Sequence, residues 1–367
     1  MKKWNKIVSV LLSLTLMATL TACGEAKRAT SSKNAVGTES TQTADEGAVK
    51  ILNMGALCFV PIHIAKQLQF FEAEGLKEGK DYTLVNASGD ISEILGTGQA
   101  DVAMNLLSAE LAPISNGLEI KTVLGIHTGC IKIVAKAGEN INSVADLKGK
   151  KIGVAQLASS AHVVAQRALE SEGIGATTEN MEVNFEVFEE DSLGLALQNG
   201  EVDAIAVEDP QATKLENEGI GKAIFDSATS DLLKNEYCCS LWATDKAISS
   251  KSEKLAKVVT AIQKASLWVE QNPDLAAQIQ VDNDWIAGDY KIDKQVISNF
   301  NYSPSVSKVQ EAVNRNSKAL QKLGLLAKDV NVDELSKNAF YKLDGVADEI
   351  TGTIKPPIDP ETQVKKS

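Results

Sequence analysis

The feature that most constrains the fold is a strand–helix pattern that occurs twice along the chain. Each copy contains a turn in which glycine, two residues and aspartate lead into an apolar run, at Gly98–Asp101 and Gly200–Asp203. Asp90 and Asp191 begin short helices 11 and 12 residues before those two aspartates. Alternating strands and helices predict parallel sheets that bind ligands at the carboxyl ends of their strands. We therefore expect an α/β protein with two lobes built on one plan.

The segment that joins the two copies is apolar but has a polar interruption. In Ile120–Lys136 the apolar residues flank His127-Thr128-Gly129-Cys130, which we interpret as the floor of a cleft between the lobes. Tyr237–Ala243 is a second apolar segment that can cross back to lobe one. The expected division is a signal peptide over 1–22, a lipid-anchored tether over 23–47, lobe one over 48–132 and 239–345, lobe two over 133–238, and a frayed tail over 346–367.

The N-terminal residues form a targeting signal. Lysines precede an apolar run, Ile7–Leu20, that is too short to span a bilayer. The run ends at Leu20-Thr21-Ala22-Cys23-Gly24, which resembles a bacterial lipobox. The resemblance implies that Cys23 carries lipid, including palmitate, and anchors the protein on the extracytoplasmic face of the cell membrane. Small polar residues then form a flexible tether.

Charge and cysteine usage exclude several classes of protein. The net charge of −12 argues against binding nucleic acid. Four cysteines follow Cys23, too few for a disulfide framework in a chain of this length: Cys58, Cys130, Cys238 and Cys239. No Cys-x-x-Cys or His-x-x-x-His spacing occurs, so we expect no metal site of the usual kind and no cofactor. No catalytic triad, carboxylate pair or glycine-rich phosphate loop indicates an enzyme.

Four motifs between residues 49 and 245 resemble the solute-binding proteins of ABC importers. They are Pro61-x-x-x-Ala65 leading to Phe70-Phe71-x-x-Glu74-Gly75-Leu76, the turn Gly98–Asp101, the segment Asp146-Leu147-Lys148-Gly149-Lys150-Lys151-Ile152-Gly153-Val154, and the turn Gly200–Asp203. The group resembled is the nitrate/sulfonate/taurine and thiamin-precursor binders with the type II periplasmic-binding fold. The resemblance implies two mostly parallel sheets flanked by helices, a small-molecule ligand, ABC permease and ATPase partners, and a monomer.

The candidate ligand-binding residues lie in the crossover and in loops that follow strands. Such loops present hydroxyl groups and free N–H groups to a ligand. The candidates are Phe59, His63, Ser88, Gly89, Asp90, Asn105, Ser108, His127, Thr128, Gly129, Cys130, Ser159, Ser160, His162 and Glu208. Arginine occurs at Arg28, Arg167 and Arg315, none of them in these loops, so a bidentate clamp for an anion is absent. The acidic groups near the loops fit a neutral or cationic ligand at least as well.

Several alternatives remain open. The three histidines could coordinate a metal together, with Cys130 or Cys58. Cys130 could form a disulfide with Cys238 or Cys239. The protein could be a membrane-tethered receptor that presents ligand to a sensor. An intracellular thiamin-pyrimidine-synthase-like enzyme shares the fold and a cysteine-rich motif, which Tyr237-Cys238-Cys239-Ser240 weakly resembles, but the lipobox argues against it.

Overall fold

The computed structural model describes residues 47–365. The predicted signal peptide, the lipid site Cys23 and nearly all of the tether lie outside the described residues. Within residues 47–365, no helix is both long enough and apolar enough to cross a membrane.

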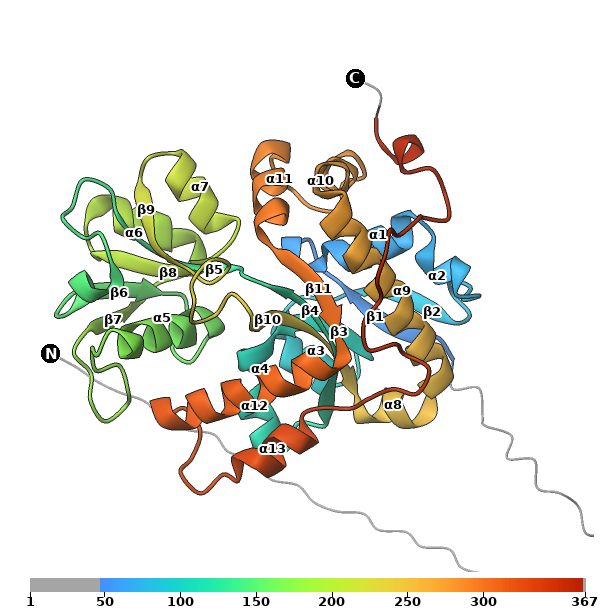
Figure 1. Cartoon of the computed structure of the whole chain (residues 1–367), viewed down its shortest axis with the longest axis horizontal. Helices are drawn as coiled ribbons and strands as arrows, with labels where there is room; N and C mark the ends of the chain where they lie inside the picture. The colour runs from blue at the N-terminus through green and yellow to red at the C-terminus, as the bar shows by residue number, and fades with distance from the viewer. Residues whose placement is uncertain (1–46, 366–367) are drawn as a thin grey trace, which may run out of the picture. The chain divides into compact units, whose positions relative to one another are not determined.

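Lobe one is built on a six-stranded sheet, drawn on the right of Figure 1. The strand order is β11-β4-β10-β3-β1-β2. The strands are β1 (Val49–Asn53), β2 (Tyr82–Asn86), β3 (Val102–Leu106), β4 (Ile120–Thr128), β10 (Tyr237–Thr244) and β11 (Asn301–Ser305). β2, β1 and β3 are parallel, whereas β10 runs antiparallel to β3 and β4.

Lobe two is built on a five-stranded sheet with the order β7-β6-β8-β5-β9. The strands are β5 (Ile131–Lys136), β6 (Lys151–Val154), β7 (Asn184–Val187), β8 (Ala204–Glu208) and β9 (Gly221–Asp226). β7, β6 and β8 are parallel, and β5 runs antiparallel to β8 and β9. β10 in lobe one and β5 in lobe two arrive by crossover from the other lobe, and lobe one has one more antiparallel strand, β11, at its edge beside β4. The predicted two-lobed fold built twice on one plan is therefore confirmed.

Helices cover both sheets. Around lobe one lie α1 (Val60–Gln67), α2 (Phe70–Ala73), α3 (Ile91–Gly96), α4 (Leu107–Ser115), α8 (Asp245–Ser250), α9 (Ser252–Gln271), α10 (Pro273–Asp282), α11 (Tyr290–Asn299), α12 (Val306–Leu323) and α13 (Val332–Asn338). Around lobe two lie α5 (Ser160–Ser171), α6 (Leu193–Asn199) and α7 (Gln211–Asn217). Short 3₁₀ turns occur at Leu57–Phe59, Val144–Leu147, Glu190–Ser192 and Pro360–Gln363.

The long helix α9 organises the core of lobe one, where it packs against α1, α2 and β11. Leu255, Val258, Ile262 and Val269 recur at helical spacing on its buried face. Each fully buried side chain of this size contributes about 1.5–3 kcal/mol to folding. The helix ends before Pro273, which begins α10.

The two glycine–aspartate turns close each sheet by the same hydrogen bonds. In lobe one the Lys50 N–H donates to Asp101 Oδ2 (2.7 Å), and the Asp101 N–H donates to the Lys50 carbonyl (2.8 Å). In lobe two the Lys151 N–H donates to Asp203 Oδ2 (2.8 Å), and the Asp203 N–H donates to the Lys151 carbonyl (2.9 Å). The aspartate of each turn therefore fixes the start of the first strand of its own lobe.

The chain after residue 345 is docked, whereas its composition predicts a frayed tail. Asp348 Oδ1 accepts hydrogen bonds from the Val306 and Ser307 N–H groups at the start of α12 (3.1 and 2.6 Å). Near the end of the described chain, the Lys365 N–H donates to Asp282 Oδ2 (2.8 Å). These partners lie on distant segments, so local composition could not reveal them.

Candidate functional site

The two crossovers touch each other where the chain passes between the lobes. The Ser227 hydroxyl, at the start of the second crossover, accepts hydrogen bonds from the Cys130 and Ile131 N–H groups (3.2 and 3.0 Å). Gly129 has φ of +70°, and a Cβ there would lie 2.6 Å from the Ala228 Cα. Only glycine combines this backbone conformation with this close approach. The polar interruption recognised in the sequence therefore lies at the junction of the lobes.

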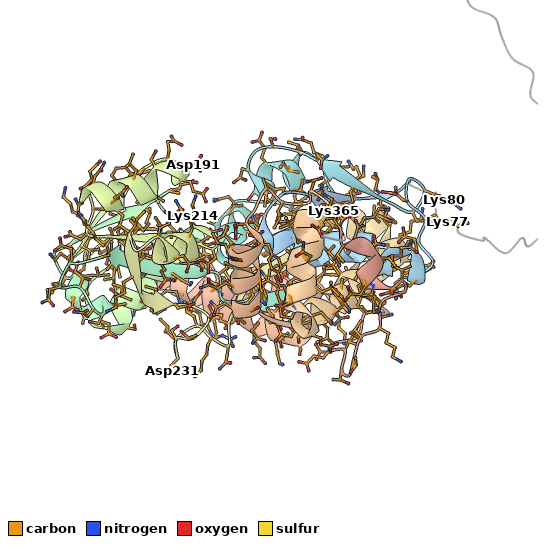
Figure 2. The ribbon with its side chains drawn as sticks, turned by 90° about the horizontal axis from the view of Figure 1, so that it is seen from above. Lys77, Lys80, Asp191, Lys214, Asp231 and Lys365 are labelled. Carbon is orange, nitrogen blue, oxygen red and sulfur yellow. The ribbon has the colours of Figure 1, made fainter. Side chains whose placement is uncertain are left out.

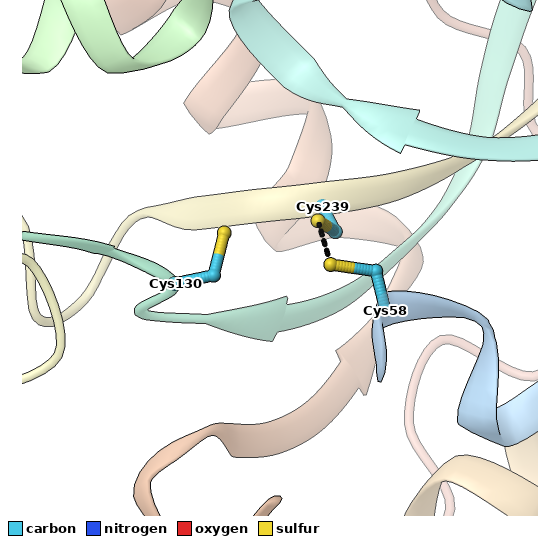
Figure 3. Close-up of side chains that lie close together, drawn as sticks. All are labelled: Cys58, Cys130 and Cys239. Carbon is cyan, nitrogen blue, oxygen red and sulfur yellow. Dashed lines mark hydrogen bonds between the residues drawn. The ribbon is translucent and has the colours of Figure 1, made fainter. Parts of the chain in front are cut away.

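Three cysteines from distant segments meet at this junction. Cys58 lies in the turn after β1, Cys130 lies just before β5, and Cys239 lies in β10 (Figure 3). Their sulfur atoms all lie within 4.8 Å of one another. The Cys239 thiol donates to the Cys58 sulfur at 3.5 Å. All four cysteines in residues 47–365 are free thiols, so the suggested pairing of Cys130 with Cys238 or Cys239 is absent there.

His127 borders this group of thiols. It pairs across strands with Cys239 in β10 and with Tyr302 in β11. Its ring stacks on Phe300, with centroids 4.5 Å apart and an interplanar angle of 5°. Nδ1 lies 3.3 Å from the Thr128 carbonyl, and Nε2 has no hydrogen-bond partner in the described part of the chain. The imidazole is therefore fully buried, fixed in orientation and left with one nitrogen unused.

The neighbouring thiols shift one another's pKa values. Hydrogen bonds from Cys130 and then Cys239 hold the pKa of the Cys58 thiol well below its usual value. Interactions with the Cys238 thiol first, and then with those of Cys239 and Cys58, raise the pKa of the Cys130 thiol well above its usual value. Burial alone lowers the pKa of His127, but its interaction with the Cys58 sulfur raises the net value. A thiolate at Cys58 is thus stabilised beside an imidazole.

Cys58 also lines a cleft of about 750 Å³ between the lobes. Residues 55–58, 286–289, 292 and 293 form the lobe-one wall, and residues around the ends of β8 and η3 (Glu190–Ser192) form the lobe-two wall. Six of the lining residues are acidic: Glu190, Asp191, Glu208, Asp209, Asp289 and Asp293. Lys214 is the basic lining residue, and Figure 2 labels it beside Asp191 on lobe two.

Two neighbouring acids on the lobe-two wall are shielded from solvent, since Asp209 is buried and Glu208 is half-buried. Burial, and then the charge of Cys58 and Cys238, raise the pKa of Glu208 well above its usual value. Burial also raises the pKa of Asp209, although Lys132 Nζ lies 3.3 Å from its carboxylate. Asp209 Oδ1 accepts from the Thr213 N–H (2.8 Å) within α7. Asp209 thus interacts within lobe two, whereas the Glu208 carboxyl is close enough to Cys58 and Cys238 for their charge to affect its pKa.

A second hollow, of about 650 Å³, lies at the other end of the lobe-one sheet. Gly98, Asp101 and Lys251 line it, next to the turn that precedes β3. Ligands of open α/β sheets bind at the carboxyl ends of the strands. The cleft at Cys58, which follows the carboxyl end of β1, is therefore the better candidate.

The other two histidines are packed inside their lobes. His63 in α1 stacks on Trp285 (4.8 Å) and its Nδ1 pairs with Gln280 Oε1 (2.6 Å). His162 in α5 accepts from the Ala158 N–H (3.0 Å) and meets Phe185 edge-on. Burial lowers the pKa of each imidazole to about 4. The structure therefore does not bring the three histidines together, and Phe59 likewise lies in the core.

The predicted hydroxyl and amide candidates divide into two groups. Ser88, Gly89 and Asp90 are exposed, and Asp90 caps α3 through the Glu93 N–H (3.1 Å).

The second group lies between the lobes. The Ser108 hydroxyl in α4 donates to the Ser160 hydroxyl in α5 (2.8 Å), so these two residues join the lobes. Ser159 caps α5 through the His162 N–H, and Asn105 Nδ2 donates to Glu110 Oε1 (2.5 Å). Glu110 is fully buried.

Sequence reasoning missed several residues of the cleft. Glu190, Asp289 and Asp293 line the cleft but belong to no predicted motif. Asp191 was identified only as the start of a helix. Phe300, which follows α11 and stacks on His127, was also missed. A weak signal existed at Gly288-Asp289, since Asp289 caps α11 by accepting from the Lys291 N–H (2.9 Å). Both non-tether arginines, Arg167 and Arg315, bind Glu236, so neither serves the cleft.

Known proteins with this architecture are similar in fold and distant in sequence. The NMT1/THI5-like family matches residues 57–276. No curated protein sequence matches the chain.

Three solved structures illustrate the likeness. The alkanesulfonate-binding protein SsuA from Xanthomonas axonopodis pv. citri, bound to MOPS, is 19% identical with a TM-score of 0.64, covering 80% of this chain and 98% of its own. The periplasmic aliphatic sulphonate-binding protein SsuA from Escherichia coli is 16% identical with a TM-score of 0.68, covering 84% and 97%. The periplasmic nitrate-binding protein NrtA from Synechocystis PCC 6803 is 11% identical with a TM-score of 0.62, covering 80% and 86%.

Two lobes of the same strand order, two crossovers and a cleft between the lobes define the type II periplasmic-binding-protein fold. Within that class, the chain belongs to the NMT1/THI5-like family. The predicted resemblance is therefore confirmed for the family and the fold, and the structural neighbours of the same fold include sulfonate- and nitrate-binding periplasmic proteins.

Proposed function

We propose that this protein is the extracytoplasmic solute-binding component of an ABC importer and not an enzyme. The observation that carries the proposal is the cleft of about 750 Å³, whose walls come from both lobes. The lobes are joined by crossovers that touch at Gly129 and Ala228. Rocking about these crossovers closes the cleft on a small molecule and offers the permease a new surface.

The captured solute is neutral or cationic. Six acidic residues and one lysine line the cleft, and the arginines outside the tether are bound to Glu236. Sulfonate and nitrate, which the names of the structural neighbours mention, are anions that are commonly held by arginine or by helix N-termini. The negative charge of this cleft favours a positively charged ligand over an anion.

The anchor and the partners follow from the N-terminal signal. Cys23 carries the lipid, residues 24–47 act as a tether, and the folded lobes work as a monomer outside the cell membrane. The permease and its ATPase then receive the solute. Replacing Cys23 with serine should release the protein from the membrane fraction and abolish labelling by a palmitate analogue; membrane retention with full labelling would contradict the anchor.

A ligand screen tests the solute-binding role. The full-length protein is melted with metal cations, organic amines, pyrimidines, sulfonates and oxyanions, and its radius of gyration is measured with each compound that stabilises it. A solute at 100 times its Kd adds about 2.7 kcal/mol to stability. We expect at least one cationic or neutral compound both to raise the melting temperature and to reduce the radius of gyration. Stabilisation without compaction by every such compound would contradict the role.

A further inference from the structure

The buried thiols of Cys130 and Cys239, the half-buried thiol of Cys58 and the buried imidazole of His127 form a group that we call the thiol–imidazole cluster. We propose that this cluster binds a thiophilic divalent metal ion, with Zn²⁺ as the representative, and that this ion is the solute captured in the cleft. The second part rests on the proposed function. We infer this class of solute from the sulfur and nitrogen atoms of the cluster and from the negative charge of the cleft.

The sulfur positions fit a metal site without rearrangement of the backbone. Zinc binds thiolate at about 2.3 Å with tetrahedral geometry, which places two ligand sulfurs about 3.8 Å apart. The Cys58 and Cys239 sulfurs are 3.5 Å apart, and all three sulfurs lie within 4.8 Å of one another. Small side-chain rotations therefore suffice to place the three sulfurs around one ion.

His127 is the candidate for the fourth ligand, although its ring nitrogens do not lie within 4.8 Å of all three sulfurs, so the ring would have to move toward a bound ion. Its Nε2 is buried and lacks a hydrogen-bond partner among the described residues, and such an orphaned group costs about 1–3 kcal/mol. Its Nδ1 lies 3.3 Å from the Thr128 carbonyl, the kind of outer contact that fixes the tautomer of metal-binding histidines. Stacking on Phe300 holds the ring plane. Three thiolates and one imidazole are a set that zinc uses.

The donor set also decides which ions are excluded. Thiolate and imidazole select zinc-class and other thiophilic ions, whereas Mg²⁺ and Ca²⁺ require oxygen ligands. Binding releases the thiol protons to solvent and changes no oxidation state, so the step needs no oxidant or reductant.

The cluster is connected both to the cleft and to the hinge. Cys58 lines the cleft, so a cation attracted by the acidic walls reaches the cluster through it. Cys130 lies at the crossover whose backbone is tied to Ser227. An ion that binds Cys58 and Cys130 together therefore joins the first loop of lobe one to the hinge, which links occupancy to lobe closure.

Metal titration of the reduced full-length protein tests the cluster. We expect one Zn²⁺ per protein, held in competition with a chromophoric chelator, and no binding of Mg²⁺ or Ca²⁺. Co²⁺ should give tetrahedral d–d bands and a thiolate-to-cobalt charge-transfer band, a readout that needs no variant. Absence of Zn²⁺ binding, or Co²⁺ spectra without the charge-transfer band, would overturn the inference.

Variants locate the ion. Cys58→Ser, Cys239→Ser and His127→Ala should each raise the Kd for Zn²⁺ by about 100-fold or more, because loss of an outer-shell partner alone costs 10–100-fold. His162→Gln, which replaces a buried imidazole in α5 of lobe two outside the cluster, is the matched control and should change the Kd by less than about 10-fold. Equal affinity in all four variants would overturn the assignment, and circular dichroism checks that each one folds.

Two further outcomes separate this inference from the proposed function. If Zn²⁺ does not bind but another compound binds and compacts the protein, the inference fails and the solute-binding role stands. If Zn²⁺ binds at the cluster without compaction, the ion is not the captured solute. A Cys58–Cys239 disulfide in protein alkylated directly from cells would also overturn the inference, because the two sulfurs would not be free to bind metal.

Discussion

The two lobes share a strand order and differ in the chemistry that they present to the cleft. After its first strand, lobe one places Cys58, next to His127 and two further thiols. At the matching end of its sheet, lobe two places Glu208 and the buried pair of Asp209 with Lys132. The duplicated plan thus determines where loops meet, whereas the residues in those loops determine what is bound. Four predictions test how far the equivalence of the lobes extends.

The largest expected difference concerns the two aspartates that close the sheets. Asp101 forms a 2.8 Å ion pair with Lys251, and both side chains are 8% exposed. Asp203 lies 3.5 Å from Lys150, with the two side chains 31% and 43% exposed. Asp101→Asn leaves a buried lysine unpaired and should cost about 3–5 kcal/mol. Asp203→Asn should cost about 1 kcal/mol or less. Equal losses in urea unfolding would show that burial does not distinguish the two turns.

The second comparison sets the hinge against a turn at the surface of lobe two. Gly129→Ala forces a Cβ against Ala228 at a positive φ and should cost about 2–4 kcal/mol. Gly138 also has a positive φ (+85°), but nothing lies within 4 Å of a Cβ there. Gly138→Ala, the matched control, should cost about 1 kcal/mol. Similar unfolding energies for the two variants would contradict close packing of the crossovers.

The third comparison concerns acid stability and the equivalent histidines His63 and His162. Burial lowers the pKa of each to about 4, below the unfolded value of about 6.5, so the unfolded state binds more protons between these values. Stability should therefore be full above pH 6.5 and fall as the pH drops toward 4. His63 alone should account for about 3 kcal/mol of this loss. His63→Gln and His162→Gln should each flatten the curve of unfolding free energy against pH; an unchanged slope would contradict the assignment.

The smallest expected effect comes from charge at the lobe-two rim. Asp191→Asn removes a negative charge and Lys214→Gln removes the positive one. At low ionic strength, the first should slow Zn²⁺ association by about twofold and the second should speed it by a similar factor, with both differences vanishing in high salt. Stopped-flow kinetics measure the rates. Changes of the same sign in both variants would show that charge does not guide the cation.

Periodicity and turn spacing predicted the architecture because they reflect local rules. The glycine–aspartate turns identified the duplication, and Ile120–Lys136 identified the crossover. The contacts of the side chains in and around the cleft were harder to predict. His63 and His162 occupy equivalent positions in their lobes, but spacing could not show that His63 meets Gln280 more than 200 residues later. The docking of the C-terminal segment depended in the same way on distant partners.

The cluster of cysteines also could not be predicted from local sequence patterns. The sequence predicted that Cys130 lies near the second crossover, but it could not predict which residues of β10 pair with which residues of the neighbouring strands. That register decides that Cys239 faces His127 and Cys58 while its neighbour Cys238 does not pair with His127. The sequence identified Cys58 only as one of several possible metal ligands. Its distance to Cys239 depends on the packing of three separate segments. The pairing of the strands and the packing of distant segments therefore decide which cysteines meet, and the sequence pattern does not show either.

The most direct test of the central claim is small-angle X-ray scattering of the reduced full-length protein with and without one equivalent of Zn²⁺. If the lobes close on a cation held at the thiol–imidazole cluster, the radius of gyration should fall on addition of Zn²⁺ in the wild type and in His162→Gln. It should stay constant in Cys58→Ser. An unchanged radius of gyration in the wild type at saturating Zn²⁺, or equal compaction in Cys58→Ser, would contradict the claim.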